Sequence, residues 1–387
     1  MFKLFVSPSA EKKILSGVQV LEGQDLLTAD LPEGLVTLYS NREKKLASAY
    51  LSPQQRGIGW VLPQAPVQLD KAYFVSLFEA AKVKRQVLEH SNLTTAYRLF
   101  NQDGDCFGGL TIDRYGDYAL FSWYNSFVYS LKNVIVSAFL EVFPDMIGGY
   151  EKCRFQGASH ISAHIYGQEA PEQFTILENG VSYNVFLNDG LMTGIFLDQH
   201  EVRGALVDGL AAGKSVINMF SYTAAFSVAA AIGGASETTS VDLAKRSREL
   251  SAAHFTANGL ALSPHRFIVM DVFDYCRYAK KKGLSYDMII LDPPSFARNK
   301  KQTFSVAKDY HKLMAQAVEL LADGGLIIAS TNASNLSLRQ FRQQIHQGMG
   351  RLAYREISRY QLPSDFTVNP VDARSNYLKV IIMEVIK

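Results

Sequence analysis

The chain has 387 residues, of which 48% are hydrophobic and 20% are charged, a mixture that supports two or three domains with complete hydrophobic cores. Its 39 Lys and Arg residues and 37 Asp and Glu residues leave a formal net charge of +2, which excludes nucleic-acid binding by bulk charge but allows a local basic patch. The three cysteines, Cys106, Cys153 and Cys276, show no CxxC spacing, so we expect neither a disulfide framework nor a bound metal.

Residues 1–68 are rich in short, strand-like runs. The apolar residues 35–39 and 46–51 flank the polar residues 41–45, and residues 57–62 form a further apolar run that is followed by prolines. Alternating apolar runs and turns of this kind are typical of strands and hairpins. We therefore predict a small β-rich module for this part of the chain.

Residues 69–190 are predicted to form an α+β middle domain. Residues 70–90 carry apolar side chains at helical spacing, with basic residues between them. Asp-Gly and Gly-Asp pairs then separate alternating apolar residues, which indicates hairpins.

Residues 191–387 alternate between strand candidates and helical stretches of ten or more residues. This alternation predicts a doubly wound parallel sheet with right-handed crossovers. The predicted parallel strands cover residues 216–220, 238–241, 267–270, 286–291 and 325–330. The last two strand candidates, 354–357 and 377–386, have no clear crossover helix between them and are expected to pair antiparallel. No apolar run is long enough to span a membrane and the first residues do not resemble a signal peptide, so we expect a cytoplasmic protein.

Polar residues follow the predicted parallel strands, where ligands of an open α/β sheet bind. Asn218 ends the first strand. Asp242 follows the second and is placed to accept hydrogen bonds from both hydroxyls of a nucleoside ribose, and Asp271 follows the third and suits the exocyclic amine of adenine. Ala224 and Ala225 stand where a dinucleotide fingerprint has glycines, which disfavours a nicotinamide cofactor. A nucleoside cofactor without a pyrophosphate fits better, and S-adenosylmethionine is the cofactor that we expect.

The run Asp292-Pro293-Pro294-Ser295-Phe296 follows the fourth strand. The two prolines fix φ and remove two donors, so their carbonyls can face a site. With the Asp292 carboxylate they form an array of acceptors suited to the N–H edge of a planar base. Phe296 can stack on the face of that base, a contact worth roughly 1–3 kcal/mol. We predict Asp292, Pro293 and Phe296 as the catalytic residues.

These motifs resemble those of class I S-adenosylmethionine-dependent methyltransferases, and more narrowly the large-subunit ribosomal RNA methyltransferase I family. Residues 109–117, 193–203, 220–223 and 292–296 carry the resemblance. It implies an α/β fold with a PUA-like first domain, the middle domain and a Rossmann-like catalytic domain over residues 191–387, with 23S ribosomal RNA as partner. Together with the strand ends, it gives these predicted cofactor-binding residues: Phe196, Asp198, Gln199, Asn218, Phe220, Ser221, Tyr222, Thr223, Ala224, Phe226, Asp242, Leu243, Asp271, Val272, Phe273 and Asp292.

The chain departs from the family pattern at three places. Asn218 stands where many class I methyltransferases have an acidic residue; its amide can still bond to the amino-acid part of the cofactor, without the attraction of a charge. Ala224 and Ala225 replace glycines and are expected to tighten the cofactor loop without closing it. The fifth strand ends in the run 330–334 (Ser-Thr-Asn-Ala-Ser), whereas cytosine-C5 relatives carry a cysteine there.

The missing cysteine decides the predicted chemistry. Cytosine C5 is a poor nucleophile and requires addition of a thiolate to C6, whereas guanine N7 or an amine needs mainly alignment with the methyl group. Cys276 is expected to be a buried helix residue. We therefore predict direct transfer of the methyl group to a nitrogen of an RNA base.

Several alternatives stay open at this point. Arg298, Lys300 and Lys301 either hold phosphates that flank the base or form a solvated loop. A homodimer is implied by the resemblance only. A methyltransferase for a protein or small molecule would be indifferent to RNA, and a non-catalytic RNA-binding relative would fail to bind the cofactor.

Overall fold

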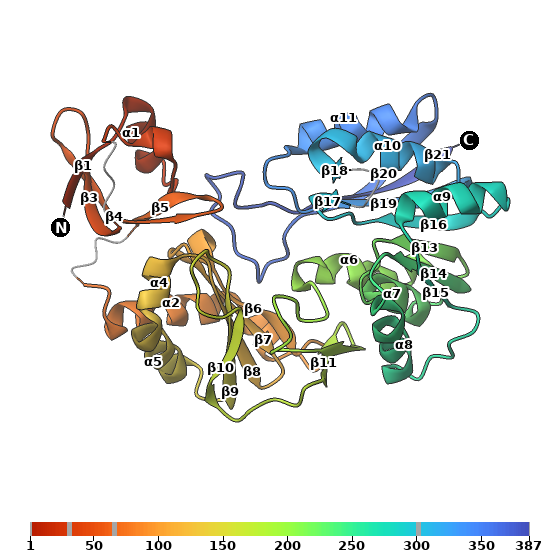
Figure 1. Ribbon diagram of the computed structural model, residues 1–387, viewed down its shortest axis with the longest axis horizontal. Helices are drawn as coiled ribbons and strands as arrows, with labels where there is room; N and C mark the ends of the chain where they lie inside the picture. Colours follow the sequence, from red (N-terminus) through yellow and green to blue (C-terminus); the bar gives the residue numbers. More distant parts are fainter. Residues whose placement is uncertain (1, 29–32, 64–67, 299–302, 387) are drawn as a thin grey trace. The chain divides into compact units, whose positions relative to one another are not determined.

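The computed structural model describes residues 2–28, 33–63, 68–298 and 303–386 (Figure 1). The chain divides into two compact units. The first consists of Met1–Phe174, Phe186–Thr193 and Ser364–Ser375; the second consists of Thr175–Val185, Gly194–Pro363 and Asn376–Lys387. The boundaries at 68 and 190 stay a prediction, because this division places the two expected N-terminal domains in one unit.

The first unit begins with a five-stranded sheet of order β1-β3-β4-β5-β2, in which β1 and β3 are parallel and the other pairs antiparallel. The bounds are β1 (Phe2–Phe5), α1 (Pro8–Leu15), β2 (Val20–Leu21), β3 (Gly34–Tyr39), β4 (Lys45–Gln54) and β5 (Gly57–Leu62). The polar residues 40–44 form the turn between β3 and β4, where Ser40 N donates to Lys44 O over 2.8 Å. The predicted β-rich module is confirmed.

A second five-stranded sheet in this unit has the order β10-β9-β8-β7-β6. Its elements are α2 (Lys71–Lys84), α3 (Gln86–Glu89), β6 (Ala96–Asn101), β7 (Leu110–Tyr115), β8 (Tyr118–Trp123), α4 (Ser126–Ser130), α5 (Lys132–Val142), β9 (Gly148–Cys153) and β10 (Ser162–Gly167). The crossover through α4 and α5 makes β8 and β9 parallel. Buried aromatic side chains of both sheets, among them Tyr50, Trp60 and Trp123, belong to one hydrophobic cluster. This mixture of helices and hairpins agrees with the predicted α+β character.

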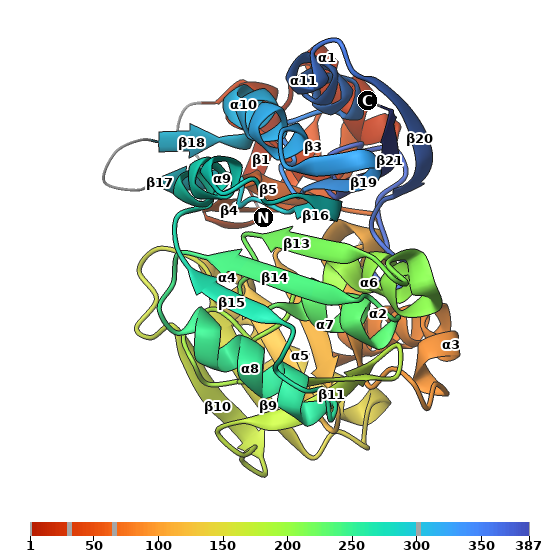
Figure 2. The same ribbon diagram turned by 90° about the vertical axis from the view of Figure 1, so that its right-hand side faces the viewer.

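The second unit contains a seven-stranded sheet of order β15-β14-β13-β16-β19-β21-β20 (Figure 2). Its strands are β13 (Ser215–Met219), β14 (Glu237–Asp242), β15 (Arg266–Val269), β16 (Tyr286–Leu291), β19 (Leu321–Thr331), β20 (Ala353–Tyr360) and β21 (Lys379–Ile386). The first five are parallel, and β21 pairs antiparallel with both β19 and β20. The predicted parallel sheet and the antiparallel final pair are confirmed.

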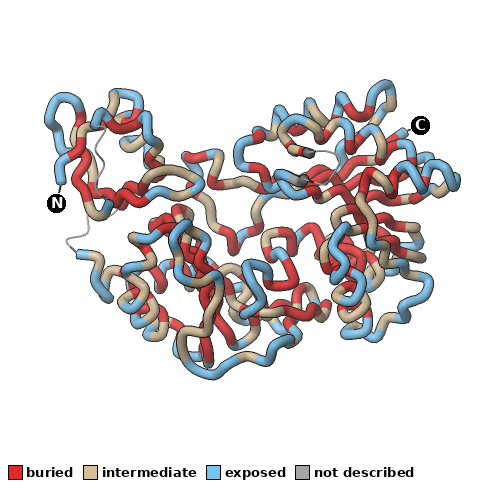
Figure 3. Tube along the Cα trace, viewed as in Figure 1, coloured by how far each residue is buried: buried red, intermediate tan, exposed pale blue. Residues whose placement is uncertain are grey.

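Helices cover both faces of this sheet, which explains its nearly continuous apolar strands. One cluster joins the sheet to α9 (Val272–Lys281), α10 (Val306–Val318) and α11 (Leu338–Met349), and another joins it to α6 (His200–Ala205) and α7 (Ala225–Ile232). Figure 3 shows its central strands as buried. Because β13 and β16 are neighbours whose crossovers run in opposite directions, the sheet has its topological switch point between their carboxyl ends, where ligands bind.

Two smaller pieces complete the second unit. A hairpin of β11 (Phe174–Glu178) and β12 (Val181–Val185) packs against α7 and α8 (Ser247–Ala257), and β17 (Phe296–Arg298) pairs with β18 (Thr303–Ser305). Of the helices that the structure describes, none has the length and apolar character needed to cross a membrane.

Candidate active site

The loop after β13 has an unusual backbone. Phe220, Tyr222 and Ala224 have φ values of 60°, 50° and 61°, in the left-handed region that residues with a side chain rarely adopt. Such conformations are enriched where a loop is curved around a ligand. Ala224 is fully buried at the start of α7. Alanine therefore occupies a conformation that usually favours glycine.

Hydrogen bonds hold this loop to two other predicted segments. Tyr222 N donates to Asp242 Oδ2 over 2.8 Å at the end of β14. Thr223 Oγ1 donates to Gly194 O over 2.7 Å, and Gly194 N donates to Tyr222 Oη over 3.1 Å. Ser221 N donates to Val241 O, and Phe220 stacks on Phe304 with ring centroids 6.4 Å apart. Residues that the sequence placed far apart thus form one connected site.

Asp242 and Asp271 lie at the ends of neighbouring strands, as predicted. Ala244 N donates to Asp242 Oδ1 over 2.8 Å, so each Asp242 oxygen takes one backbone N–H and keeps a second lone pair for a hydroxyl. Asp271 caps α9 by accepting from Phe273 N and Asp274 N. Leu243, which follows Asp242, is 56% exposed.

Some of the predicted cofactor-binding residues have side chains that pack inside the protein. The side chains of Val272 and Phe273 belong to the core of the sheet. Asn218 is buried, and its Nδ2 donates to Ser227 Oγ over 3.1 Å, while its Oδ1 has no protein partner. Phe226 is buried beneath the Arg203 guanidinium, 5.4 Å from the ring centroid. In this geometry the Asn218 amide ties β13 to α7, and its predicted contact to the amino-acid moiety of the cofactor stays a prediction.

Asp292 is the centre of a short polar chain at the end of β16. Gln199 Nε2 donates to Asp292 Oδ2 over 2.8 Å, and Ser330 Oγ lies 3.4 Å from Gln199 Oε1. Burial and the nearby Asp198 carboxylate raise the pKa of Asp292 to about 6, against the opposing hydrogen bonds of Ser330 and Gln199. Asp292 is therefore an oriented acceptor that ionises close to physiological pH.

The remaining predicted residues surround Asp292 and the loop. Tyr377 Oη donates to Asp198 Oδ2 over 2.9 Å. Phe196 is 46% exposed and its ring centroid lies 5.7 Å from that of Tyr222. Pro293 is buried, whereas Phe296 is 62% exposed and available for stacking.

The sequence analysis missed the residues that brace this site. Arg203 forms a buried ion pair with Glu178 of β11 and donates to Phe196 O over 2.7 Å. Tyr183 Oη donates to Ala225 O over 3.3 Å, and the His254 ring nitrogens face Thr223 O and Asn184 O at 2.9 and 3.1 Å. Arg203 lies inside the segment that carried the family resemblance, but nothing in the sequence pointed to Glu178 as its partner.

The thiol of Cys276 does not face the site. Cys276 is 3% exposed on α9, and its Sγ lies 4.0 Å from Met219 Sδ in the core. Burial raises the pKa of this thiol to about 12. Cys106 and Cys153 belong to the other unit. The predicted burial of Cys276 is confirmed.

Basic residues follow Phe296 in the sequence. Lys300 and Lys301 lie outside the described residues, and only the backbone of Arg298 is described. A phosphate-binding role for them stays a prediction.

A sheet of this order, with a curved loop after its first strand and acidic residues after the next two, defines a class I methyltransferase domain. The family model for S-adenosylmethionine-dependent methyltransferases matches residues 152–377, and the model for a PUA-like domain matches residues 4–64. The chain belongs to the S-adenosylmethionine-dependent methyltransferase family, and S-adenosylmethionine is its cofactor.

Relatives and solved structures resemble nearly the whole chain. It is 43% identical over 382 residues to "Putative ribosomal RNA large subunit methyltransferase YwbD" of Bacillus subtilis, covering 96% of each chain. It is 30% identical over 373 residues to "Ribosomal RNA large subunit methyltransferase I" of Aliivibrio fischeri, covering 94% of this chain and 92% of the relative. The crystal structure of "SMU.776, a putative methyltransferase complexed with SAH" has 59% identity and a TM-score of 0.96, covering 99% of this chain and 100% of that one. A second structure, from Streptococcus mutans, has 58% identity and a TM-score of 0.94, with the same coverage.

Proposed function

We propose that this enzyme methylates a base of large-subunit (23S) ribosomal RNA in the cytoplasm, and that the accepting atom is a nitrogen. The names of the two relatives support the substrate class. The observation that carries the choice of atom is the end of β19, where Ser330, Thr331 and Asn332 follow one another and, among the residues that the structure describes, no thiol faces Asp292. Methylation of cytosine C5 requires a thiolate that adds to the ring.

In this proposal, one group of the described residues binds the cofactor and another binds the base. Asp242 and the loop 220–224 hold the nucleoside, and Asp271 offers its carboxylate to the adenine. When bound, S-adenosylmethionine supplies an electrophilic methyl group. Asp292, oriented by Gln199, accepts an N–H of the target base and stabilises the positive charge that develops on it, while Phe296 stacks on its face.

Methyl incorporation into ribosomal RNA tests this proposal. The RNA is taken from a strain without this gene and incubated with labelled S-adenosylmethionine, and the product nucleoside is identified by mass spectrometry. An N-methylated base is expected from the native enzyme and from the variant with all three cysteines replaced by serine. Formation of 5-methylcytosine, or loss of turnover in the cysteine-free variant while cofactor binding survives, would overturn the choice of nitrogen.

In this proposal the first unit supplies contacts that bind the RNA. Extracting a base from structured RNA costs a few kcal/mol, which contacts outside the catalytic domain offset. The PUA-like match at residues 4–64 supports this assignment. Substitution of exposed basic residues of this module, such as Lys44 and Lys45, is expected to weaken RNA binding while cofactor binding persists. A homodimer stays a prediction that light scattering on the purified protein would test.

A further inference from the structure

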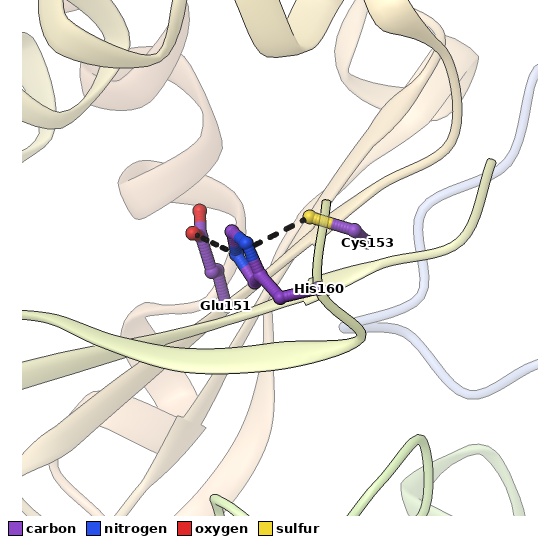
Figure 4. A group of neighbouring side chains, drawn as sticks. All are labelled: Glu151, Cys153 and His160. Carbon is purple, nitrogen blue, oxygen red and sulfur yellow. Dashed lines mark hydrogen bonds and ion pairs between the residues drawn. The ribbon is translucent and has the colours of Figure 1, made fainter. Parts of the chain in front are cut away.

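A group of three potential metal ligands lies at the loop end of the β9–β10 hairpin, in the first unit. Glu151 and Cys153 are two residues apart on β9, so their side chains share one face of the sheet, and His160 ends the connecting loop. The loop is closed by Cys153 N, which donates to Ile161 O over 2.9 Å. Figure 4 shows the His160 ring between the carboxylate and the thiol.

The three ligand atoms converge on one point. His160 Nε2 lies 2.8 Å from Glu151 Oε1 and 3.8 Å from Cys153 Sγ, and all three atoms lie within 4.8 Å of one another. A tetrahedral zinc site with ordinary bond lengths places its ligand atoms about 3.3–3.7 Å apart. The same imidazole nitrogen faces both partners, whereas a catalytic Cys–His–Glu relay would use the two ring nitrogens separately.

The surrounding residues orient the ligands as outer-shell partners of metal sites do. In the structure His160 Nε2–H donates to Glu151 Oε1; when a cation binds, the ring carries its proton on Nδ1 instead, where Ser159 Oγ at 3.0 Å accepts it and leaves the Nε2 lone pair for the cation. Trp123 Nε1 donates to Glu151 Oε2 over 2.9 Å, so the cation would bind at Oε1, which in the structure faces His160 Nε2 and Lys132 Nζ. Glu151 and Cys153 are buried, and His160 is one-third exposed, which gives a cation access from solvent.

We propose that Glu151, Cys153 and His160 bind one Zn²⁺, with a water molecule as fourth ligand. The cation displaces the thiol proton to solvent, and thiolate and carboxylate together balance its two positive charges. Lys132 Nζ, now 2.8 Å from Glu151 Oε1, belongs to a partly exposed side chain that can turn toward solvent. Bound in this way, Zn²⁺ fastens the loop 154–160 to β9. The sequence analysis expected no metal because these ligands follow no CxxC pattern.

Metal binding to the full-length protein tests this site independently of any methyl-transfer activity. The protein is stripped with EDTA, then titrated with Zn²⁺ against a chromogenic chelator and with Co²⁺ as a spectroscopic probe. We expect one equivalent of Zn²⁺ and a thiolate-to-Co²⁺ charge-transfer band. Cys153→Ser and His160→Gln should abolish the band or weaken binding by about tenfold or more, and Ser159→Ala should weaken it less.

Cys106→Ser is the matched control, since it removes a thiol of the same unit outside the cluster. Its stoichiometry and Co²⁺ spectrum should equal those of the native protein, and circular dichroism should show that every variant is folded. Substoichiometric Zn²⁺, a Co²⁺ spectrum without a thiolate band, or equal losses in Cys106→Ser would overturn the proposal.

Discussion

Gln199 donates its side-chain amide to Asp292 Oδ2 over 2.8 Å, although the two residues are 93 positions apart. The contact joins the segment before α6 to the end of β16. It fixes one oxygen of a carboxylate whose pKa is raised to about 6 by burial. The orientation and the ionisation of Asp292 are therefore coupled, and both can be measured.

Replacing Asp292 should separate stability from activity. Because the folded pKa of about 6 exceeds the ordinary aspartate value of 3.8, the stabilisation associated with protonated Asp292 is present below pH 4 and is lost as the pH rises through 6. At pH 7.5 the free energy of unfolding of Asp292→Asn should therefore be about 1–3 kcal/mol higher than that of the native enzyme. Its kcat should fall by at least about 100-fold. Urea denaturation at pH 5 and 7.5, with turnover, measures both. Asp208 is an exposed residue of the same unit, and Asp208→Asn should change neither the free energy of unfolding nor kcat. If the difference in unfolding free energy between Asp292→Asn and the native enzyme were the same at pH 5 and at pH 7.5, the assigned pKa would be contradicted.

Gln199→Ala should move the pH dependence of turnover. Its hydrogen bond favours ionised Asp292, so removing it should raise the pKa and shift the acid limb of the kcat profile to higher pH. A drop in kcat of about tenfold is expected, since a hydrogen bond to a charged group is worth roughly 1.5–3 kcal/mol. Ser330→Ala removes the other hydrogen bond that favours ionised Asp292 and should shift the profile in the same direction. A fall in kcat without any shift would show that Gln199 serves only as packing.

The sheet and the positions of its functional ends were predictable because both depend on local patterns. Apolar runs such as 286–291 mark a strand covered on both faces, and the residue after each strand reaches the carboxyl edge by geometry alone. The bracing contacts were not predictable. Glu178 and Arg203 are 25 residues apart, and Asn258 donates to Ser182 O across 76 residues. Neither pairing leaves a periodic signal in the sequence.

Asn218 shows the same limit at a single residue. Its place at the end of β13 was predicted, but the direction of its amide depends on Ser227 of α7, which contacts it only after the crossover has formed. The segment Ser364–Ser375 likewise joins the first unit, although in the chain it lies between β20 and β21 of the catalytic sheet. Such placements depend on long-range packing.

Phe296 should contribute to RNA recognition and not to folding. Its side chain is 62% exposed, so Phe296→Ala is expected to leave the unfolding free energy within about 0.5 kcal/mol of the native value. Loss of stacking should raise KM for RNA about 5- to 150-fold. Phe296→Tyr should restore most of the affinity, and filter binding with the ribosomal RNA measures it. An unchanged KM in Phe296→Ala would remove this residue from the site.

Ala224 tests the strain in the cofactor loop. Glycine at this position would relieve a left-handed conformation with a φ of 61° but lose a buried methyl group, each worth about 1 kcal/mol, so Ala224→Gly should be nearly neutral. Ala231→Gly, in the regular part of α7, should lose about 1 kcal/mol because it has no strain to relieve. Ala224→Val should lose at least about 2 kcal/mol and impair cofactor binding. Equal losses in the two glycine variants would show that the loop is unstrained.

The buried pair Arg203–Glu178 should be essential to the second unit. Arg203→Ala leaves the Glu178 carboxylate buried without its partner and releases Phe196 O, so we expect a loss of about 3–5 kcal/mol in unfolding free energy and weaker cofactor binding. The exposed pair Arg266–Glu237 is the control, and Arg266→Ala should cost less than about 1 kcal/mol. The double variant Arg203→Met with Glu178→Leu should regain most of the stability, because no buried charge remains, but not the cofactor affinity, because Phe196 O stays unbound. Recovery of both properties would show that Arg203 acts only through its charge. Calorimetric titration of S-adenosylmethionine alongside urea denaturation distinguishes the two outcomes.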